Sequence, residues 1–143
     1  VLEDDAYVKG NKLISLKKEK KIKKVVICSG KIYYDLLEER EKARIDDIVF
    51  IRLEQLYPFP AKTLAKVLKN YKKAEFIWCQ EEPKNMGAWN TMRNYIDRTL
   101  EMINFKDIKV KFVGRSASST TATGNANKHL AQQKEILEKI LKH

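Results

Sequence analysis

The chain has 143 residues, of which 29 are Lys or Arg and 19 are Asp or Glu, giving a formal net charge of +10 at pH 7. This length accommodates one domain, and a hydrophobic share of 43% is enough for a buried core. No apolar run approaches the roughly 20 residues that a membrane-spanning helix needs, and two cysteines, Cys28 and Cys79, cannot form a disulfide framework.

Residues 1–23 are polar and weakly periodic, and we interpret them as a linker or as an edge segment that belongs to an upstream part of a longer protein. The domain itself is expected over residues 24–143. The run from Lys17 to Lys24 is rich in lysine, and such runs are usually solvated. It contains neither Arg nor an aromatic residue, which a nucleic-acid-binding face would need, so we expect no nucleic-acid partner.

Four short apolar runs, rich in β-branched or aromatic residues, predict strands over 25–28, 48–51, 76–79 and 110–113. After each run, apolar residues recur at helical spacing: from Ile32 to Leu37, over 61–72, from Met92 to Ile103, and from Leu130 to Leu141. Repeated strand–helix cycles indicate an α/β domain with a twisted, mostly parallel sheet. Right-handed crossovers place helices on both faces of such a sheet.

In open parallel sheets, ligands and partners meet the carboxyl ends of the strands. Here these ends carry Ser29-Gly30, Glu54-Gln55, Gln80-Glu81-Glu82 and Gly114-Arg115-Ser116. His129 and His143 are the only histidines in the sequence, so few side chains are available for general acid–base catalysis near neutral pH. Neither cysteine has the spacing of a zinc site, and the sequence contains no nucleotide-binding glycine motif. We therefore predict no catalytic residue and no metal ligand.

Three residues at these strand ends leave alternatives open. Glu81 and Glu82 are adjacent, so on an extended chain one is expected to turn into the structure while the other faces solvent. They are either interface carboxylates or loop charges. Arg115 is either a solvated loop residue or an anion ligand; in the second case the hydroxyls of Ser116 and Ser118, ahead of a helix, complete an anion-binding loop.

Four sequence segments, taken in order, are similar to those of a known family. They are Val25–Leu37, Arg52–Pro60, Trp78–Trp89, and Gly114–Ser118 followed by Gly124 and His129–Gln133. Together they resemble the C-terminal domain of the first, thiamine-diphosphate-dependent, decarboxylating component of 2-oxoglutarate dehydrogenase. The similarity extends over about residues 24–142. One departure is Thr121, because the family usually has a proline shortly before the glycine of the last loop.

The resemblance implies a fold like the C-terminal domain of transketolase. It also implies that the full protein is a homodimer that oxidatively decarboxylates 2-oxoglutarate and transfers the succinyl group to the lipoyl group of the second component, in the tricarboxylic acid cycle. In such enzymes thiamine diphosphate and Mg²⁺ lie between the two upstream domains. We therefore expect this chain to bind no cofactor and to be inactive in isolation.

The role expected from the resemblance is structural and dimer-supporting, with Glu54, Gln55, Tyr57 and Glu82 at a subunit interface or an active-site wall. The expected partners are the rest of the polypeptide, a second subunit and a lipoyl-bearing succinyltransferase, without a membrane. No signal peptide or Arg-rich presequence is visible, so we expect a cytoplasmic protein of bacterial type. The alternatives are a stand-alone anion- or nucleotide-binding α/β module that uses Arg115 and, third, a basic nucleic-acid-binding domain.

Overall fold

The structure, a computed structural model, describes residues 1–7, 13–115 and 126–142, with side chains given from Leu130 onward in the last range. Within these residues, the strands form one parallel sheet in the order β2-β1-β3-β4. The strands are β1 (Lys24–Cys28), β2 (Ile48–Arg52), β3 (Glu75–Pro83) and β4 (Lys111–Arg115). The predicted parallel α/β architecture is confirmed.

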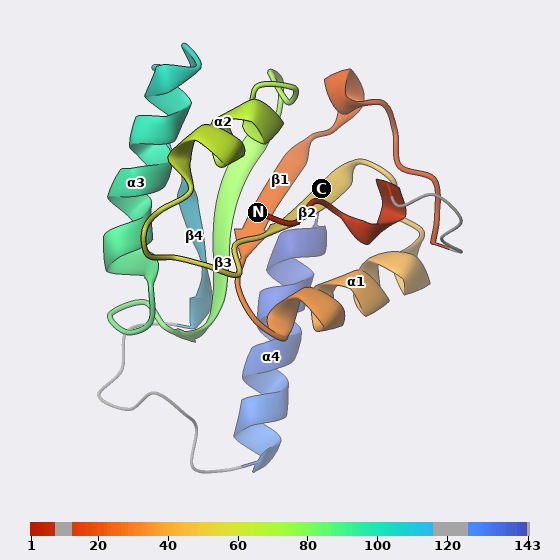
Figure 1. Ribbon diagram of the computed structural model, residues 1–143. Coiled ribbons are helices and arrows are strands. Elements are labelled where there is room, and N and C mark those ends of the chain that lie inside the picture. Colours follow the sequence, from red (N-terminus) through yellow and green to blue (C-terminus); the bar gives the residue numbers. More distant parts are fainter. Residues whose placement is uncertain (8–12, 116–125, 143) are drawn as a thin grey trace.

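Helices cover both faces of the sheet (Figure 1). Helices α1 (Ile32–Ala43) and α4 (Ala126–Leu141) pack together on one face, and α2 (Ala61–Leu68) and α3 (Trp89–Met102) pack together on the other. The strands begin at the top of the view in Figure 1 and end at the bottom, where the β3–α3 loop and the amino end of α4 also lie. This arrangement places all four carboxyl strand ends at one end of the molecule.

The central strand β1 shows why the core has two layers. Val25 and Ile27 pack towards α2 and α3, whereas Val26 and Cys28 pack towards α1 and α4, and all four side chains are inaccessible to solvent. A strand covered on both faces needs apolar residues at every position, which explains the continuous run. Cys28 is in register with the buried Cys79 of β3. Burial raises the pKa of the Cys28 thiol from 9.0 to about 12 and raises that of Cys79 well above its usual range.

Several element boundaries differ from those predicted by periodicity, among them the ends of α2 and β3. The helix predicted over 61–72 ends at Leu68, because Lys69 and Asn70 form a turn and Asn is a weak helix former. Tyr71 nevertheless reaches the core and is buried, which is why it matched the helical spacing. Strand β3 continues four residues beyond the predicted end at Cys79, and its pairing with β4 is irregular between Cys79 and Pro83.

The first residues of the chain lie against the edge strand β2. The backbone of Leu2 exchanges two hydrogen bonds of 2.9 Å with that of Arg52, in an antiparallel bridge. The backbone N–H of Asp5 donates to the Tyr33 hydroxyl at 3.1 Å, and the guanidinium of Arg52 lies over the Tyr33 ring at 4.2 Å. A domain boundary at residue 24 stays a prediction, although residues 2–5 contact both α1 and β2.

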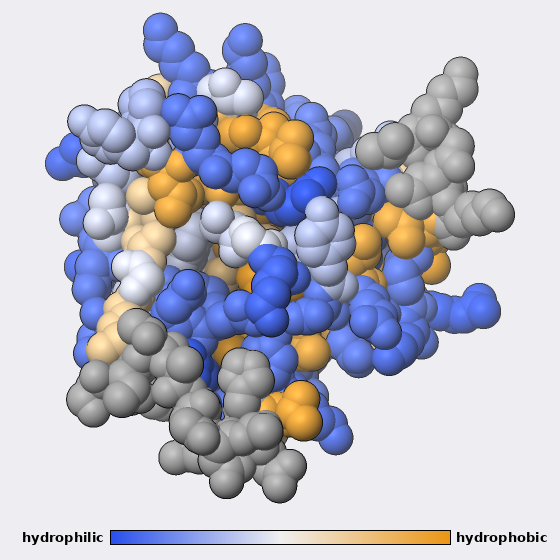
Figure 2. Space-filling view, turned by 60° about the horizontal axis from the view of Figure 1, so that its bottom comes forward, coloured by the Kyte–Doolittle hydropathy of each residue, from blue (hydrophilic) through white to orange (hydrophobic). Residues whose placement is uncertain are grey.

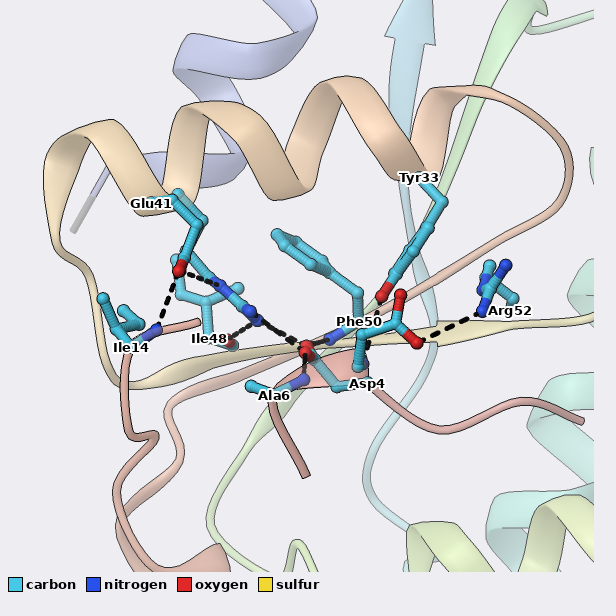
Figure 3. Close-up of polar contacts among 10 residues, drawn as sticks. Asp4, Ala6, Ile14, Tyr33, Glu41, Ile48, Phe50 and Arg52 are labelled. Carbon is cyan, nitrogen blue, oxygen red and sulfur yellow. Dashed lines mark hydrogen bonds and ion pairs between the residues drawn. The ribbon is translucent and has the colours of Figure 1, made fainter. Parts of the chain in front are cut away.

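The centre of this contact is a buried ion pair (Figure 3). Asp4 and Arg40 are 1% and 0% exposed, and both carboxylate oxygens of Asp4 accept hydrogen bonds from the guanidinium. The backbone N–H of Phe50 also donates to Asp4, at 2.8 Å, and that of Ala6 does so at 2.9 Å. Arg40 donates to the Ile48 carbonyl at 3.2 Å. The amino-terminal segment, α1 and β2 therefore share one network.

We predict that Asp4→Asn lowers the free energy of unfolding by about 3–5 kcal/mol, because it leaves a buried guanidinium without its counter-charge. Chemical denaturation measures this directly. Glu3→Gln is the matched control, since Glu3 is exposed and adjacent in sequence, and it should change stability by less than about 0.5 kcal/mol. Equal effects of the two substitutions would contradict a structural role for the pair.

The buried thiols give an expected pH dependence. Above pH 9 an unfolded chain loses the Cys28 proton, whereas the folded chain keeps it until about pH 12. Stability should therefore be complete below pH 9 and fall as the pH rises towards 12, by at most about 1.4 kcal/mol per pH unit for one thiol. In Cys28→Ala this contribution is absent, so denaturation midpoints between pH 8 and 11 should decline less steeply. Parallel declines in parent and variant would refute the assignment.

Candidate functional site

Three of the four predicted interface residues lie together on the loop that follows β2. Glu54 and Gln55 are exposed, and the Tyr57 side chain is 88% exposed. Gln55 Nε2 donates to the Tyr57 carbonyl at 3.2 Å, and Glu54 Oε1 lies 3.9 Å from Arg52 Nη1. Glu82, also exposed, is on β3, two strands away in the sheet. The structure thus gathers three of these side chains in one solvent-facing loop and leaves Glu82 apart from them.

The carboxyl end of β3 is organised by Gln80, a residue whose role the sequence did not reveal. Its side chain is buried, with 4% of the residue exposed. The amide oxygen accepts from the Trp78 indole at 2.9 Å and from the Trp89 backbone N–H at 3.1 Å. The amide nitrogen lies 2.8–3.1 Å from three carbonyl oxygens, those of Glu82, Pro83 and Met86. One side chain therefore fixes the whole turn between β3 and α3.

Glycines allow this turn to close on Gln80. Gly87 has a φ of +69°, and a Cβ there would lie 3.2 Å from Gln80 Oε1. At Gly114 in β4, a Cβ would lie 2.8 Å from the Gln80 carbonyl oxygen and 2.6 Å from the Phe112 ring. Side chains at either position would push against the amide or its strand. The only sequence signal was a polar amide directly after an apolar strand, and that pattern does not separate a structural role from ligand binding.

Glu81 turns inward while Glu82 faces solvent, as expected for adjacent residues of an extended chain. Glu81 is half-buried; its carboxylate lies 3.7 Å from Lys31 Nζ and accepts from Gln133 Nε2 at 3.3 Å. The same Gln133 amide donates to Asp35 at 3.1 Å. Glu81 therefore contacts Lys31, directly before α1, and Gln133 on α4. It acts here as a structural carboxylate.

Arg115 is tied to the same network. Its Nε donates to the Glu81 carbonyl at 2.6 Å, and Nη1 lies 3.5 Å from Gln132 Oε1 on α4. Ser116 and Ser118, the other members of the predicted anion loop, lie outside the described residues, as do the side chain of His129 and all of His143. The anion site thus stays a prediction, and Arg115 has a structural use that the sequence did not indicate.

The surface at the carboxyl ends of the strands is mainly hydrophilic, with scattered hydrophobic patches (Figure 2). Among the described residues, no group of three or more His, Cys, Asp or Glu side chains is arranged to hold a metal ion. In the same part of the chain, no helix is both long and apolar enough to span a bilayer. The described strand ends hold loops in place and leave Glu54, Gln55, Tyr57 and Glu82 exposed to solvent.

Fold and site together define a parallel α/β domain whose strand ends carry exposed side chains and structural networks. The sequence model of the family described as 2-oxoglutarate dehydrogenase C-terminal matches residues 1–141, and the chain belongs to this family. Its fold is of the kind found in the C-terminal domain of transketolase, as the resemblance implied.

Curated relatives agree with the family assignment. The chain is 52% identical, over 141 residues, to the 2-oxoglutarate dehydrogenase E1 component of Brucella abortus (strain S19), and 51% identical to that of Brucella anthropi. In both cases the alignment covers 99% of this chain but 14% of the relative. The chain thus spans about one seventh of the length of the relatives that it matches.

We predict that Gln80→Ala lowers the free energy of unfolding by about 2 kcal/mol or more, because it leaves several buried groups of the β3–α3 turn without partners. It should also accelerate hydrogen exchange of the Trp89 amide, which loses its acceptor. Gln55→Ala is the control, because Gln55 is exposed and belongs to another strand end. Unchanged Trp89 exchange in Gln80→Ala would show that the turn does not depend on this amide.

Proposed function

We propose that this chain is the structural, dimer-supporting C-terminal domain of a longer 2-oxoglutarate dehydrogenase. That enzyme oxidatively decarboxylates 2-oxoglutarate and transfers the succinyl group to the lipoyl group of its second component, in the tricarboxylic acid cycle. The observation that carries the proposal is 52% identity over 99% of the chain to proteins named as its E1 component. The proposed enzyme is a homodimer in the bacterial cytoplasm.

The proposed contribution of this chain is contact rather than catalysis. Tyr57 offers an almost fully exposed aromatic ring, flanked by the exposed Glu54 and Gln55, and aromatic side chains contribute strongly to protein interfaces. With Glu82, these residues would form part of a subunit interface or of the wall of the active site. Arg115, with Ser116 and Ser118, is proposed to bind an anion in the same region.

Thiamine diphosphate and Mg²⁺ are the cofactors of the proposed enzyme, and the former supplies the electron sink for decarboxylation. The described residues contain no group of three or more His, Cys, Asp or Glu side chains arranged to hold a metal ion. From the family resemblance, we propose that upstream parts of the polypeptide hold the cofactors. The alternative of a stand-alone anion- or nucleotide-binding module has less support, because the chain belongs to the 2-oxoglutarate dehydrogenase C-terminal family.

The isolated chain should not decarboxylate 2-oxoglutarate. After cooperative thermal unfolding has shown that it is folded, it is mixed with 2-oxoglutarate, thiamine diphosphate, Mg²⁺ and ferricyanide as electron acceptor. Ferricyanide reduction should not exceed that of a blank without protein. The longer polypeptide containing this chain serves as the positive control, and a failure of that polypeptide to turn over 2-oxoglutarate would remove the proposed function altogether.

In the longer polypeptide, Tyr57→Ala should weaken dimerisation by about tenfold or more, the size expected for an aromatic interface contact. Analytical ultracentrifugation over a range of protein concentrations measures this. Met102→Ala is the matched control, because Met102 is also an exposed apolar residue but ends α3 at the opposite end of the sheet. If the two variants dimerise as the parent does, Tyr57 is not part of the interface.

A further inference from the structure

The amino end of the sheet carries a group of lysines that the proposed function does not use. We name Lys18, Lys20, Lys69, Lys72 and Lys73 the lysine cluster; all five are exposed. The turn at Glu19–Lys21 and the loop after α2 bring them together, at the top of the view in Figure 1. This position is at the opposite end of the strands from Tyr57 and Arg115.

Two adjoining hollows shape this surface. One, of about 290 Å³, is lined by Glu19, Lys20, Lys69, Asn70, Lys72 and Lys73. The other, of about 660 Å³, is lined by Tyr7, Leu16, Lys17, Lys18, Glu19 and Lys20. Glu19 and Lys20 border both hollows, which therefore lie on either side of one short turn. Such a shape suits an extended ligand better than a single compact anion.

Several exposed lysines in the described part of the chain are ion-paired, whereas those of the lysine cluster are not. Lys31, Lys42, Lys109 and Lys111 each have a carboxylate within 4 Å, at distances of 3.2–3.7 Å. None of the five cluster lysines has one, and Glu19 is the single acidic residue that lines the first hollow. Crowded like charges repel one another, so an anionic partner would stabilise this surface.

The chemistry of the surface favours an acidic polypeptide over other anions. Its cations are all lysines, and Tyr7 is the single aromatic residue lining the hollows, whereas nucleic-acid surfaces combine Arg with several stacking aromatics. The carboxylate of Glu19 stands between the hollows and would repel a phosphate chain. A polypeptide can place backbone N–H donors against Glu19 and its own carboxylates against the lysines, and Leu16 gives it an apolar contact.

A second copy of this chain is a poor occupant. The chain carries a net charge of +10, and the acidic run of α1 is already engaged. Glu38 and Glu39 pair with Lys42, and Glu41 accepts from the backbone N–H of Ile14 at 2.7 Å. We propose that the lysine cluster is the docking surface for an acidic segment of a partner protein. This proposal does not rest on the enzymatic activity.

The test uses the longer polypeptide that contains this chain and a fluorescein-labelled deca-glutamate peptide. Binding is measured by fluorescence anisotropy, and carbodiimide followed by mass spectrometry identifies the lysines that become linked to the peptide. We expect links at Lys20, Lys69, Lys72 and Lys73, and an affinity that falls as salt is added. Lys20→Gln, Lys69→Gln, Lys72→Gln and Lys73→Gln combined should weaken binding about tenfold or more.

The matched control removes four exposed lysines from other parts of the domain: Lys31→Gln, Lys42→Gln, Lys84→Gln and Lys134→Gln. It has the same net charge as the cluster variant and should retain affinity within about threefold. Equal losses in both variants would show attraction to net charge alone and overturn the proposal. Tighter binding of a single-stranded oligonucleotide to the same lysines would also overturn it. Chemical acetylation of the exposed lysines gives a further check. If the cluster lysines are acetylated in the isolated chain but not in the longer polypeptide, upstream polypeptide covers them and the proposal is wrong.

Discussion

The carboxylate of Asp4 lies against the guanidinium of Arg40 inside the protein, where water reaches neither group. Removing two charges from water costs several kcal/mol for each ion, so such a pair persists only where further hydrogen bonds complete it. Here the backbone N–H groups of Phe50 and Ala6 and the carbonyl of Ile48 do so. Ala6 belongs to the amino-terminal segment, Arg40 to α1, and Ile48 and Phe50 to β2, so these hydrogen bonds form only when the three segments are in place. This requirement sets the position of the first residues against α1 and the edge strand β2.

The carboxyl end of the sheet obeys the same rule with an uncharged group. A buried amide must find partners for both its oxygen and its nitrogen, and Gln80 finds them in the β3–α3 turn and in Trp78. Next to it, Glu81 and Arg115 link that strand end to α1 and α4. The polar residues that would mark a ligand site in many parallel sheets are thus largely committed to holding loops. The loop at Glu54–Tyr57, by contrast, remains exposed to solvent.

Sequence patterns identified the parts of the fold that depend on apolar periodicity. The runs at Val25, Ile48 and Phe76 predicted three strands within one residue of their observed starts, because a strand buried on both faces cannot tolerate polar residues. The same reasoning failed for Asp4 and Arg40, since each lies in a charged stretch that looks solvated and only the tertiary structure pairs them across 36 positions. Gln80 was missed for a related reason: its partners are mostly backbone atoms, which leave no mark in the sequence. Tyr57 and its neighbours were found through the family resemblance, whereas their exposure required the structure.

The distribution of charge follows from these contacts. At the carboxyl ends of the strands, Lys31 and Arg115 face carboxylate, carbonyl and amide oxygens of Glu81 and Gln132, so positive charge there stabilises the fold. At the amino end, five lysines gather around two hollows with Glu19 as their acidic neighbour. Folding alone gains nothing from this second arrangement, because repulsion between like charges opposes it. The net charge of +10 is therefore unevenly balanced: among the described residues, lysines such as Lys23, Lys31 and Lys111 lie next to carboxylates, whereas those of the lysine cluster do not.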